Sequence, residues 1–465
     1  MDRKSTGKEN PVFLRDKDWR DKEKEMSDFK EIRVDSITRV EGHGNIYIRL
    51  SRGKVRDVLL EIPEGPRLFE TLVLGKEPRE VVNIVPRICA ICNISHRYAA
   101  IRALEKILAL AVPPEVVLLR NLMHYGEMIE SHSLHLFFLA LPDFLGYPDA
   151  LTMVEKYPEE VNTGLRLKKF GNYVMETIAG RMIHGENPTV GGFGRFLTKE
   201  ELQSLRDGAE RLIPEAIRTT ELFRNLHYST YAEEGMLFAC LKPPTDTYGF
   251  WGDEVMISNG DDRTVEEFRV LIKERVYPHS TAKRTLYKER PYVVGAIARM
   301  NLLGERLHGA AREAFQHSYS LSWIRNPLYN NLAQAIEIVF ALEEIVKTAD
   351  RLLKIKKVPR LLPITKGEGK GVGAVEAPRG SLFHYYEFDD GVCTKADLII
   401  PTAQNYNAME RHLRVAAENL FSNSSVSLNQ AKSELEMLVR AYDPCISCSC
   451  HIVEIDANFT RSVPR

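Results

Sequence analysis

Two cysteine pairs, one toward each end of the chain, place the strongest constraint on how this sequence can fold. Cys89 and Cys92 form the first pair, and Cys445 and Cys448 form the second. A C-x-x-C spacing lets two sulfurs converge on one metal ion. A zinc ribbon joins two such pairs through a loop of roughly 15–20 residues, whereas most of this chain separates the pairs. A shared metal therefore requires a fold in which distant parts of the chain meet.

The composition is that of an ordinary globular protein and excludes several classes of function. Of the 465 residues, 44% are hydrophobic and 27% are charged, and the formal net charge is −1. A nearly neutral chain lacks the basic surface that binds nucleic acid or an anionic membrane. The longest strongly apolar run, Leu134–Leu141, is far shorter than the ~20 residues needed to span a bilayer. We expect neither a nucleic-acid partner nor a membrane span.

The charge and cysteine distributions predict the domain organisation. Residues 1–32 are strongly charged and contain no continuous apolar segment, so we expect a disordered tail without a signal peptide. The chain has seven cysteines, four of them in the two pairs, which does not suit a disulfide framework and indicates the reducing cytoplasm. No linker or repeat interrupts residues 33–451, which are expected to form a single domain.

The hydrophobic pattern predicts a mainly helical α+β fold with small β pieces. Alternating apolar residues predict one hairpin over 34–63 and a second over 383–400. The glycine-rich segment 366–373 neither follows a clear strand nor opens a helix, which favours a flexible loop over a phosphate-binding turn. Helices are expected over 116–139, 162–180, 198–226, 264–275, 298–323, 331–354, 404–420 and 427–441.

Four thiolates favour a soft metal, and zinc, copper, nickel and iron–sulfur clusters all fit. A structural zinc site is the ordinary interpretation of two C-x-x-C pairs. The long separation of the pairs weighs against it, as do the charged and imidazole residues beside them, which are Arg87, His96, Asp443 and His451. A zinc ribbon would also leave the large body before the second pair unexplained.

Taken together, the two motifs resemble those of a known family. Arg87-x-Cys-x-x-Cys92 and Asp443-Pro-Cys-x-x-Cys-x-x-His451 are similar to the two signatures of the large subunit of nickel–iron hydrogenases. The sequences RVEGH at 39–43, EAPRG at 376–380 and IPT at 400–402 occur in the family's order. The resemblance covers residues 33–465, and several segments most resemble the cytoplasmic, bidirectional NADP-linked branch, also called sulfhydrogenases.

The resemblance implies a catalytic subunit that reversibly cleaves H₂ at a thiolate-bound nickel–iron centre, whose iron also carries CO and cyanide. Cys89 and Cys445 match the thiolates that bind nickel alone. Cys92 and Cys448 match those that bridge nickel and iron. Glu41 matches the carboxylate that relays a proton away from Cys445. Taken by itself, Glu41 would be read as a surface acid, since most acidic residues are exposed.

Other matching residues are expected around this centre. Arg379 matches the guanidinium over the open metal position, and Thr402 matches the hydroxyl that hydrogen-bonds a cyanide. Glu70 and His451 match ligands of a nearby magnesium-type ion, although Glu70 also suits an ordinary helix N-terminus. His96 and Asp443 resemble residues that orient the thiolates.

The resemblance also has consequences at the end of the chain and in the outer shell of the site. In this family a maturation endopeptidase removes the segment after the motif histidine once nickel is loaded. Residues 452–465 are therefore expected to be removed, which leaves His451 as the mature end. Ala90 replaces a glycine of many relatives, a change that should leave the metal site intact. Ser131 replaces an aspartate of membrane-bound relatives, so the outer polar shell is expected to differ.

Electrons released from H₂ need a route out of the chain. The remaining cysteines, Cys240, Cys393 and Cys450, are too few for a Cys₄ cluster, and no dinucleotide fingerprint is present. The resemblance implies an iron–sulfur small subunit, with flavin- and NAD(P)-binding and further iron–sulfur subunits. Three alternatives stay open: a hydrogen sensor with the same metal site, a non-catalytic scaffold like the related complex I subunit, and a structural zinc protein. The four cysteines weigh against the scaffold.

Overall fold

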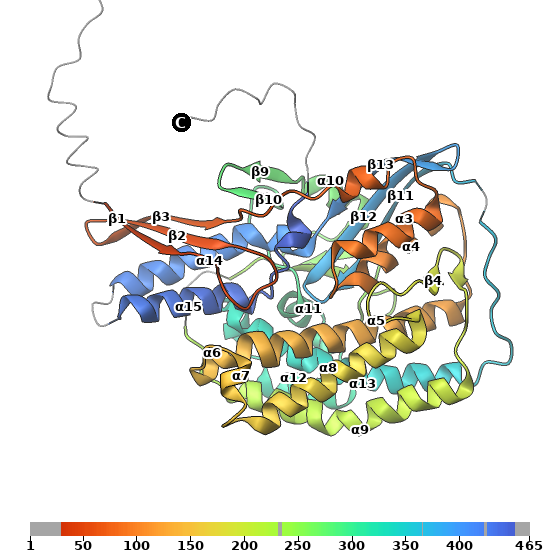
Figure 1. The fold of residues 1–465 in the computed structure, drawn as a ribbon, viewed down its shortest axis with the longest axis horizontal. Helices are drawn as coiled ribbons and strands as arrows, with labels where there is room; N and C mark the ends of the chain where they lie inside the picture. The colour runs from red at the N-terminus through yellow and green to blue at the C-terminus, as the bar shows by residue number, and fades with distance from the viewer. Residues whose placement is uncertain (1–28, 231–234, 365, 423–425, 452–465) are drawn as a thin grey trace, which may run out of the picture.

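The computed structural model describes residues 29–230, 235–364, 366–422 and 426–451. Four long helices run along one side of the molecule (Figure 1), namely α5 (Pro114–Leu134), α8 (Pro158–Ala179), α9 (Lys199–Arg224) and α13 (Asn330–Leu352). The sheets and the remaining long helices form the other side. The expected α+β architecture is confirmed.

The other helices are mostly short. They are α2 (Phe69–Leu72), α3 (Pro78–Ile84), α4 (Asn93–Ile107), α6 (Leu141–Leu145), α7 (Ala150–Met153), α10 (Val265–Leu271), α11 (Ala296–Leu303), α12 (Gly309–Ser318), α14 (Pro401–Ser422) and α15 (Leu428–Ala441). No helix among the described residues is both long and apolar enough to cross a membrane.

The strands form small antiparallel sheets. They are β1 (Phe29–Val34), β2 (Asn45–Ser51) and β3 (Lys54–Glu61); β4 (Pro188–Thr189) and β5 (Gly192–Phe193); β6 (Ala239–Lys242), β7 (Glu254–Ile257) and β8 (Arg263–Thr264); β9 (Arg275–Tyr277) and β10 (Ser280–Arg284); and β11 (Gly369–Ala377), β12 (Gly380–Asp389) and β13 (Val392–Ile399). Both expected hairpins are present, as β2–β3 and β12–β13.

The first sheet corrects the expected boundary of the charged tail. Strand β1 pairs with β2 from Phe29 opposite Ser51 to Val34 opposite Ile46, so residues 29–32 belong to the sheet and not to a tail. Residues 1–28 and 452–465 lie outside the described residues. The loop between β1 and β2 reaches the second cysteine motif, because a Cβ on Gly42 would lie 2.8 Å from the Ile446 Cβ.

Most of the glycine-rich segment 366–373 belongs to a strand and is not a flexible loop, because β11 begins at Gly369. Strand β11 runs antiparallel to β12 along its whole length and lies on α4. The glycines allow this close approach: a Cβ on Gly373 would lie 2.0 Å from the Ala99 carbonyl oxygen, and one on Gly371 would lie 2.7 Å from that of Ala103. Alternate residues share one face of a strand, so this spacing keeps that face free of side chains where the helix crosses.

The helix expected over 298–323 is wrong as a single element. The chain leaves α11 through a 3₁₀ turn at Gly304–Arg306 and then forms α12. The Phe315 ring of α12 packs where a Cβ on Gly304 would sit, 2.4 Å away. The other expected helices are present with shifted ends. In particular, α5 continues through a π-helical segment at His135–Ala140.

Candidate metal centre and its surroundings

The fold brings the four motif cysteines together. The four sulfur atoms all lie within 4.8 Å of one another, and the residues that carry them, Cys89, Cys92, Cys445 and Cys448, are all buried. The first pair stands at the start of α4, where Cys92 is the N-cap residue. The second pair follows α15, and Cys448 lies in a 3₁₀ turn. The Cys89 and Cys445 sulfurs, one from each motif, are 3.6 Å apart.

Two of these sulfurs are bonded to each other in the structure. Cys445 and Cys448 form a disulfide, so their use as metal ligands requires reduction to thiolates. Cys89 is a free thiol that accepts hydrogen bonds from the backbone N–H groups of Ile91, at 3.3 Å, and Cys92, at 3.2 Å. A side-chain hydrogen bond from Cys92 lowers the pKa of Cys89, and the charge of Arg379 acts in the same direction. The surroundings therefore favour a thiolate at Cys89.

Glu41 reaches the cysteines from the loop between β1 and β2. Its Oε2 atom lies 3.1 Å from the Cys445 sulfur and accepts a hydrogen bond of 3.1 Å from the backbone N–H of Ser447. The Ser447 hydroxyl donates to the other carboxylate oxygen. The Ile446 N–H donates to the Glu41 carbonyl at 2.9 Å, which ties the two segments together. Glu41 is only partly buried, so it links the sulfurs with the outside.

Arg379 is held beside the cysteines by Asp443. Its Nε donates to the Asp443 carbonyl at 2.7 Å and its Nη2 to the Asp443 carboxylate at 3.0 Å. The remaining nitrogen, Nη1, is buried without a hydrogen-bond partner. Burial opposes the charge of Arg379, but Asp443 and the neighbouring thiols raise its pKa above the usual value. Asp443 therefore orients the guanidinium of Arg379. The structure records no hydrogen bond between the Asp443 side chain and a cysteine sulfur.

A small cavity of about 10 Å³ lies between these groups. Thr402, at the start of α14, lines it, and its hydroxyl oxygen accepts a 3.0 Å hydrogen bond from the Cys445 N–H. The hydroxyl hydrogen remains available for another partner. The cavity wall consists of Cys92, His96, Ala377, Arg379, Leu382, Ile400, Pro401, Thr402, Cys445 and Cys448.

His96 contributes one edge of its ring to this arrangement. Its Nδ1 lies 3.1 Å from Nε2 of His384, and its Nε2 is buried without a partner. Burial lowers the pKa of His96 well below the usual value, so the ring is neutral. The predicted site residue is therefore on the cavity wall, but the structure records no hydrogen bond between its ring and a thiol.

Glu70 and His451 lie in a region with several charges. Both Glu70 oxygens accept from the Lys283 ammonium, at 3.2 and 3.3 Å, and Oε1 also accepts from the Leu398 N–H at 2.9 Å. His451 Nε2 donates to the Cys448 carbonyl at 2.5 Å, and its buried Nδ1 has no partner. Carboxylate oxygens of Glu70, Glu274 and Asp397 lie within 4.8 Å of one another and could hold a metal ion, but His451 does not belong to this group.

Several residues near the site carried no signal in the sequence. Ser447 holds Glu41, and Lys283 and Glu274 accompany Glu70, but each contact depends on distant segments. Glu127 of α5 accepts the Ile94 N–H at 2.6 Å at the start of α4. Burial raises the pKa of Glu127 to about 8. The run GEMIE around it looked like an ordinary buried helix.

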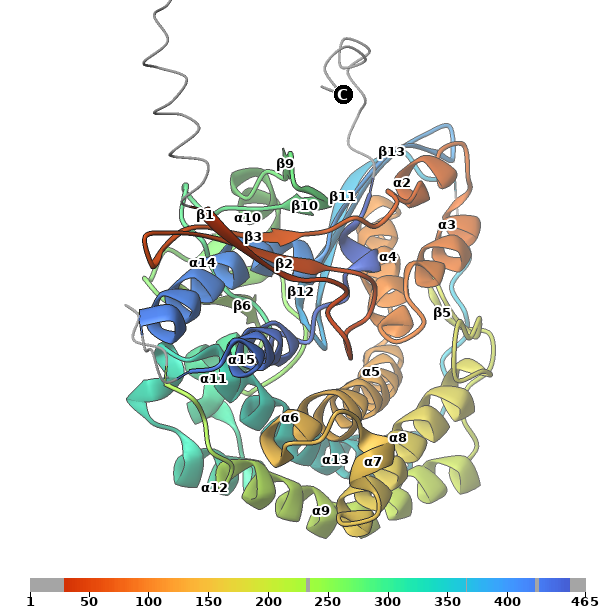
Figure 2. The ribbon, with the colours of Figure 1, turned by 60° about the vertical axis from the view of Figure 1, so that its left-hand side comes forward.

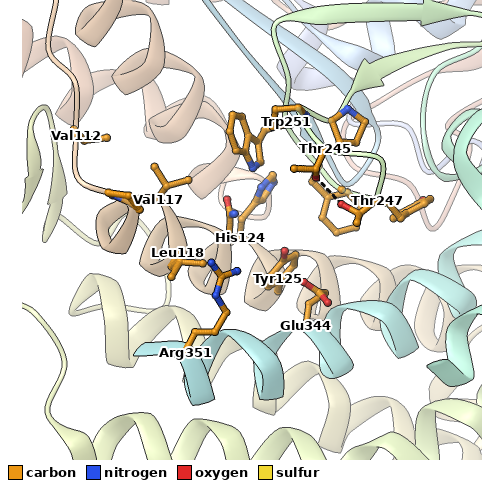
Figure 3. Close-up of a pocket in the computed structure, with 17 residues that line it drawn as sticks. Val112, Val117, Leu118, His124, Tyr125, Thr245, Thr247, Trp251, Glu344 and Arg351 are labelled. Atoms are coloured by element: carbon orange, nitrogen blue, oxygen red, sulfur yellow. Dashed lines mark hydrogen bonds between the residues drawn. The ribbon is translucent and has the colours of Figure 1, made fainter. Parts of the chain in front are cut away.

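A larger cavity, of about 430 Å³, lies away from the cysteines (Figure 3). It is bounded by α5, by α13 and by the loop after β6, and Trp251, Tyr125 and Arg351 face it. None of the four motif cysteines lines it. His124 lies between this cavity and Ser95 of α4, with 3.3 Å between its Nε2 and the Ser95 hydroxyl. The chemistry of the chain is therefore centred on the smaller cavity.

A family model described as nickel-dependent hydrogenase matches residues 67–173 and 247–451, which include both cysteine pairs. The chain belongs to the nickel-dependent hydrogenases. A HoxL-like model matches residues 31–64. Sulfhydrogenase 2 subunit alpha of Pyrococcus furiosus is 42% identical over 91% of this chain and 100% of its own length. Sulfhydrogenase 1 subunit alpha of the same organism is 39% identical over 91% of this chain and 98% of its own length.

More distant relatives agree with this assignment. The NAD-reducing hydrogenase HoxS subunit beta of Cupriavidus necator is 31% identical over 91% of this chain and 95% of its own length. A crystal structure of an NAD⁺-reducing [NiFe]-hydrogenase in the H₂-reduced state superposes with a TM-score of 0.82, at 29% identity, over 91% of this chain and 99% of that one. This hydrogenase chain is the catalytic large subunit, an oxidoreductase that acts on H₂.

Proposed function

We propose that this hydrogenase subunit holds its nickel–iron centre through Cys89, Cys92, Cys445 and Cys448. The clustering of their sulfurs within 4.8 Å carries this proposal, because it brings four buried cysteines from two distant motifs to one place. Thiolates are the preferred ligands of soft metals. When bound, the centre supplies a site at which H₂ can be split heterolytically. The residues around it then decide where the proton goes and how the metal ligands are oriented.

The hydrogen-bond donors beside the sulfurs suit diatomic ligands on iron. Arg379 offers an unpartnered buried N–H group at Nη1, and Thr402 offers an undonated hydroxyl hydrogen. Both residues line the small cavity. A buried donor without an acceptor costs free energy, and two cyanide nitrogens would satisfy both donors. CO, which accepts hydrogen bonds poorly, would face the apolar part of the wall.

Glu41 is the first proton acceptor beyond Cys445 in this proposal. A general base must lie within hydrogen-bond reach of its proton, and the reduced Cys445 thiol would be 3.1 Å from Glu41 Oε2. The Ser447 hydroxyl and N–H fix the carboxylate in place. The partial exposure of Glu41 gives the proton a way to leave.

A magnesium-type ion is proposed beside Glu70 and His451. His451 Nδ1 and Glu274 Oε1 are both buried without partners near Lys283, which supports an additional cation or ordered water there. Carboxylate oxygens with water suit a hard divalent ion, and His451 would add a single imidazole nitrogen. Lys283 already neutralises part of the carboxylate charge, so this ion would be held by few protein ligands.

Electrons leave this subunit through a separate iron–sulfur protein. Among the described residues no second group of cysteines lies close enough to hold a cluster. The loop around His184 is a suitable docking face, because His184 Nε2 lies 3.3 Å from the Cys89 carbonyl while Met182 and Ile183 are 45% and 46% exposed. Because relatives include an NAD-reducing hydrogenase subunit, we propose an NAD(P)-linked assembly with flavin-binding and further iron–sulfur subunits in the cytoplasm.

The segment after His451 is proposed to be removed by a maturation endopeptidase. His451 is itself 2% exposed, which is compatible with an end that packs inside the finished subunit. The mass of the active enzyme tests this step: a subunit that ends at His451 supports it, and an active subunit that retains residues 452–465 contradicts it.

Infrared spectroscopy with metal analysis tests the proposed site as a whole. Purified enzyme should contain nickel and iron and show absorption bands of CO and cyanide. It should also oxidise H₂ with a viologen dye at a rate far above that of a sensor protein. Zinc without nickel, and a spectrum without these bands, would contradict the proposed centre.

A further inference from the structure

Three buried side chains form a hydrogen-bonded chain that ends at the small cavity. His96 of α4 stands at the cavity, and His384 and Tyr386 follow on β12. The His96 Nδ1 and the His384 Nε2 are 3.1 Å apart, and the His384 Nδ1 and the Tyr386 hydroxyl are 2.8 Å apart. The exposed fractions are 1% for His96 and 0% for the other two residues, so water does not complete the hydrogen bonding of this chain.

The hydrogen-bond partners that the structure records for the two rings are each other and the Tyr386 hydroxyl, and none of these is an acid. Both rings are buried, and a buried imidazolium without a counter-charge is costly, so both rings are neutral. A neutral imidazole has one N–H donor and one bare nitrogen that accepts. Each ring therefore has one of two tautomers, and the neighbours decide which.

The hydroxyl of Tyr386 sets the direction of donation in this series of hydrogen bonds. The structure records one hydrogen-bond partner for this hydroxyl, which is His384 Nδ1. If the hydroxyl did not donate to this nitrogen, its hydrogen would be buried without an acceptor, which costs free energy. Tyr386 therefore donates, and His384 accepts at Nδ1. The proton of His384 must then be on Nε2, which donates to His96 Nδ1. That leaves the proton of His96 on Nε2.

The opposite direction is unfavourable at both ends. It would leave the Tyr386 hydrogen without an acceptor. It would also leave His96 Nε2 without its hydrogen. The bare lone pair of this nitrogen would then lie at the cavity that Cys92, Cys445 and Cys448 line. A lone pair beside anionic thiolates is repelled, whereas an N–H group is attracted to them.

We propose that Tyr386 is a positioning residue that fixes, through His384, the tautomer in which His96 presents its Nε2–H as a donor to the cysteine sulfurs of the metal site. This inference rests on the metal site proposed above. An N–H donor withdraws charge from a thiolate and so reduces the electron density that the thiolate gives to its metal. The phenol, though remote from the sulfurs, would thereby influence the electronic state of the centre.

Tyr386→Phe in the complete enzyme is the direct test. The change removes only the hydroxyl, so His384 loses its fixed proton donor and the His96 N–H is no longer held toward the sulfurs. The thiolates would then give more electron density to the metals, and back-donation from iron to CO would increase. The infrared band of CO should therefore move to lower wavenumber. Turnover should fall roughly 10-fold, as is common when a hydrogen bond behind a metal ligand is lost. Nickel content should stay normal.

Tyr385→Phe is the matched control on the same strand. The Tyr385 hydroxyl donates to Glu387 and not to a histidine, so its removal should leave the CO band in place. The Tyr386→Phe change should also be tested in a His96→Gln background. If Tyr386 acts through His96, it should produce no further band shift there, because interacting residues are non-additive.

Each outcome either supports or overturns the inference. An unchanged band in nickel-loaded Tyr386→Phe, an equal shift in the His96→Gln background, or an equal shift in Tyr385→Phe would overturn it. Should Tyr386→Phe fail to load nickel, His384→Gln replaces it, and an unchanged band there overturns the inference too. A parent enzyme without CO and cyanide bands would instead contradict the proposed metal site, so the two failures are distinguishable.

Discussion

The Glu41 carboxylate lies 3.1 Å from the Cys445 sulfur, although the two residues stand near opposite ends of the sequence. Three further contacts, from the backbone N–H groups of Ile446 and Ser447 and from the Ser447 hydroxyl, keep them together. A carboxylate in this place can take a proton from the reduced thiol without any large movement. The relationship leads to the first prediction.

Glu41→Gln should abolish most turnover without loss of the metals. The amide keeps the shape of the side chain but cannot take up the proton, and losing a general base typically costs 10²–10⁴-fold. H₂ oxidation with a viologen dye and nickel content per subunit are the measurements. Glu64→Gln is the control, because Glu64 is also half-buried in this region but binds His43. Normal turnover in Glu41→Gln would mean that the proton leaves by another route.

Cys448→Ser should eliminate nickel from the purified subunit. A hydroxyl is a harder and far less acidic ligand than a thiol, so the site loses affinity for a soft metal. Since we propose that nickel loading precedes processing, the variant should also keep residues 452–465, which mass spectrometry would detect. Cys240→Ala serves as the control, because Cys240 is equally buried but lies on β6. Full nickel in Cys448→Ser would remove this residue from the ligand set.

Arg379→Lys should impair turnover while preserving the charge. An ammonium cannot at the same time occupy the two positions by which Asp443 holds the guanidinium, at 2.7 and 3.0 Å, and present a third donor to the cavity. We expect a loss of roughly 10–100-fold with shifted cyanide bands and normal nickel content. Arg33→Lys, in an exposed ion pair with Glu61, should behave like the parent enzyme. Unshifted bands in Arg379→Lys would show that Arg379 does not contact these ligands.

Glu337→Gln should destabilise the protein in a pH-dependent way. Burial opposes ionisation of Glu337, but Arg299 and His132, at 2.6 to 2.7 Å, hold its pKa at about 2. Its folded pKa is below the ordinary 4.5, so the stabilisation is complete above about pH 5 and is lost as the pH falls toward 2.

The loss on substitution should therefore be largest near pH 7. Leaving the buried Arg299 short of a carboxylate costs about 3–5 kcal/mol, and urea denaturation at several pH values measures the difference. Below pH 5 the gap between the two proteins should narrow. Asp390→Asn, in an exposed pair with Lys366, should change little at any pH. A gap that widens on acidification would contradict the assigned charge of Glu337.

The motif cysteines were predictable from the sequence because their spacing encodes the chemistry of a metal site, and a metal shared by both pairs requires them to meet. The long amphipathic helices were predictable because their apolar periodicity is local. By contrast, Lys283 contacts Glu70 and His384 contacts His96 across more than two hundred residues of sequence. No local sequence pattern predicts such contacts. Strand β11 was missed because glycine is poor in strands, and the reason for its glycines is the helix that crosses them.

Gly373→Ala should therefore disturb the metal site from a distance. The added Cβ would lie 2.0 Å from the Ala99 carbonyl oxygen and 2.4 Å from the Ala103 nitrogen, both backbone atoms of α4. Either β11 or α4 must move, and overpacking of this kind costs about 1–3 kcal/mol. Because Cys92 is the N-cap residue of α4, displacement of the helix should also lower nickel occupancy. Thermal denaturation and metal analysis measure the two effects. Gly65→Ala, whose Cβ would meet nothing within 4 Å, should change neither quantity. A Gly373→Ala protein with normal stability and full nickel would show that strand and helix can separate without affecting the cysteines.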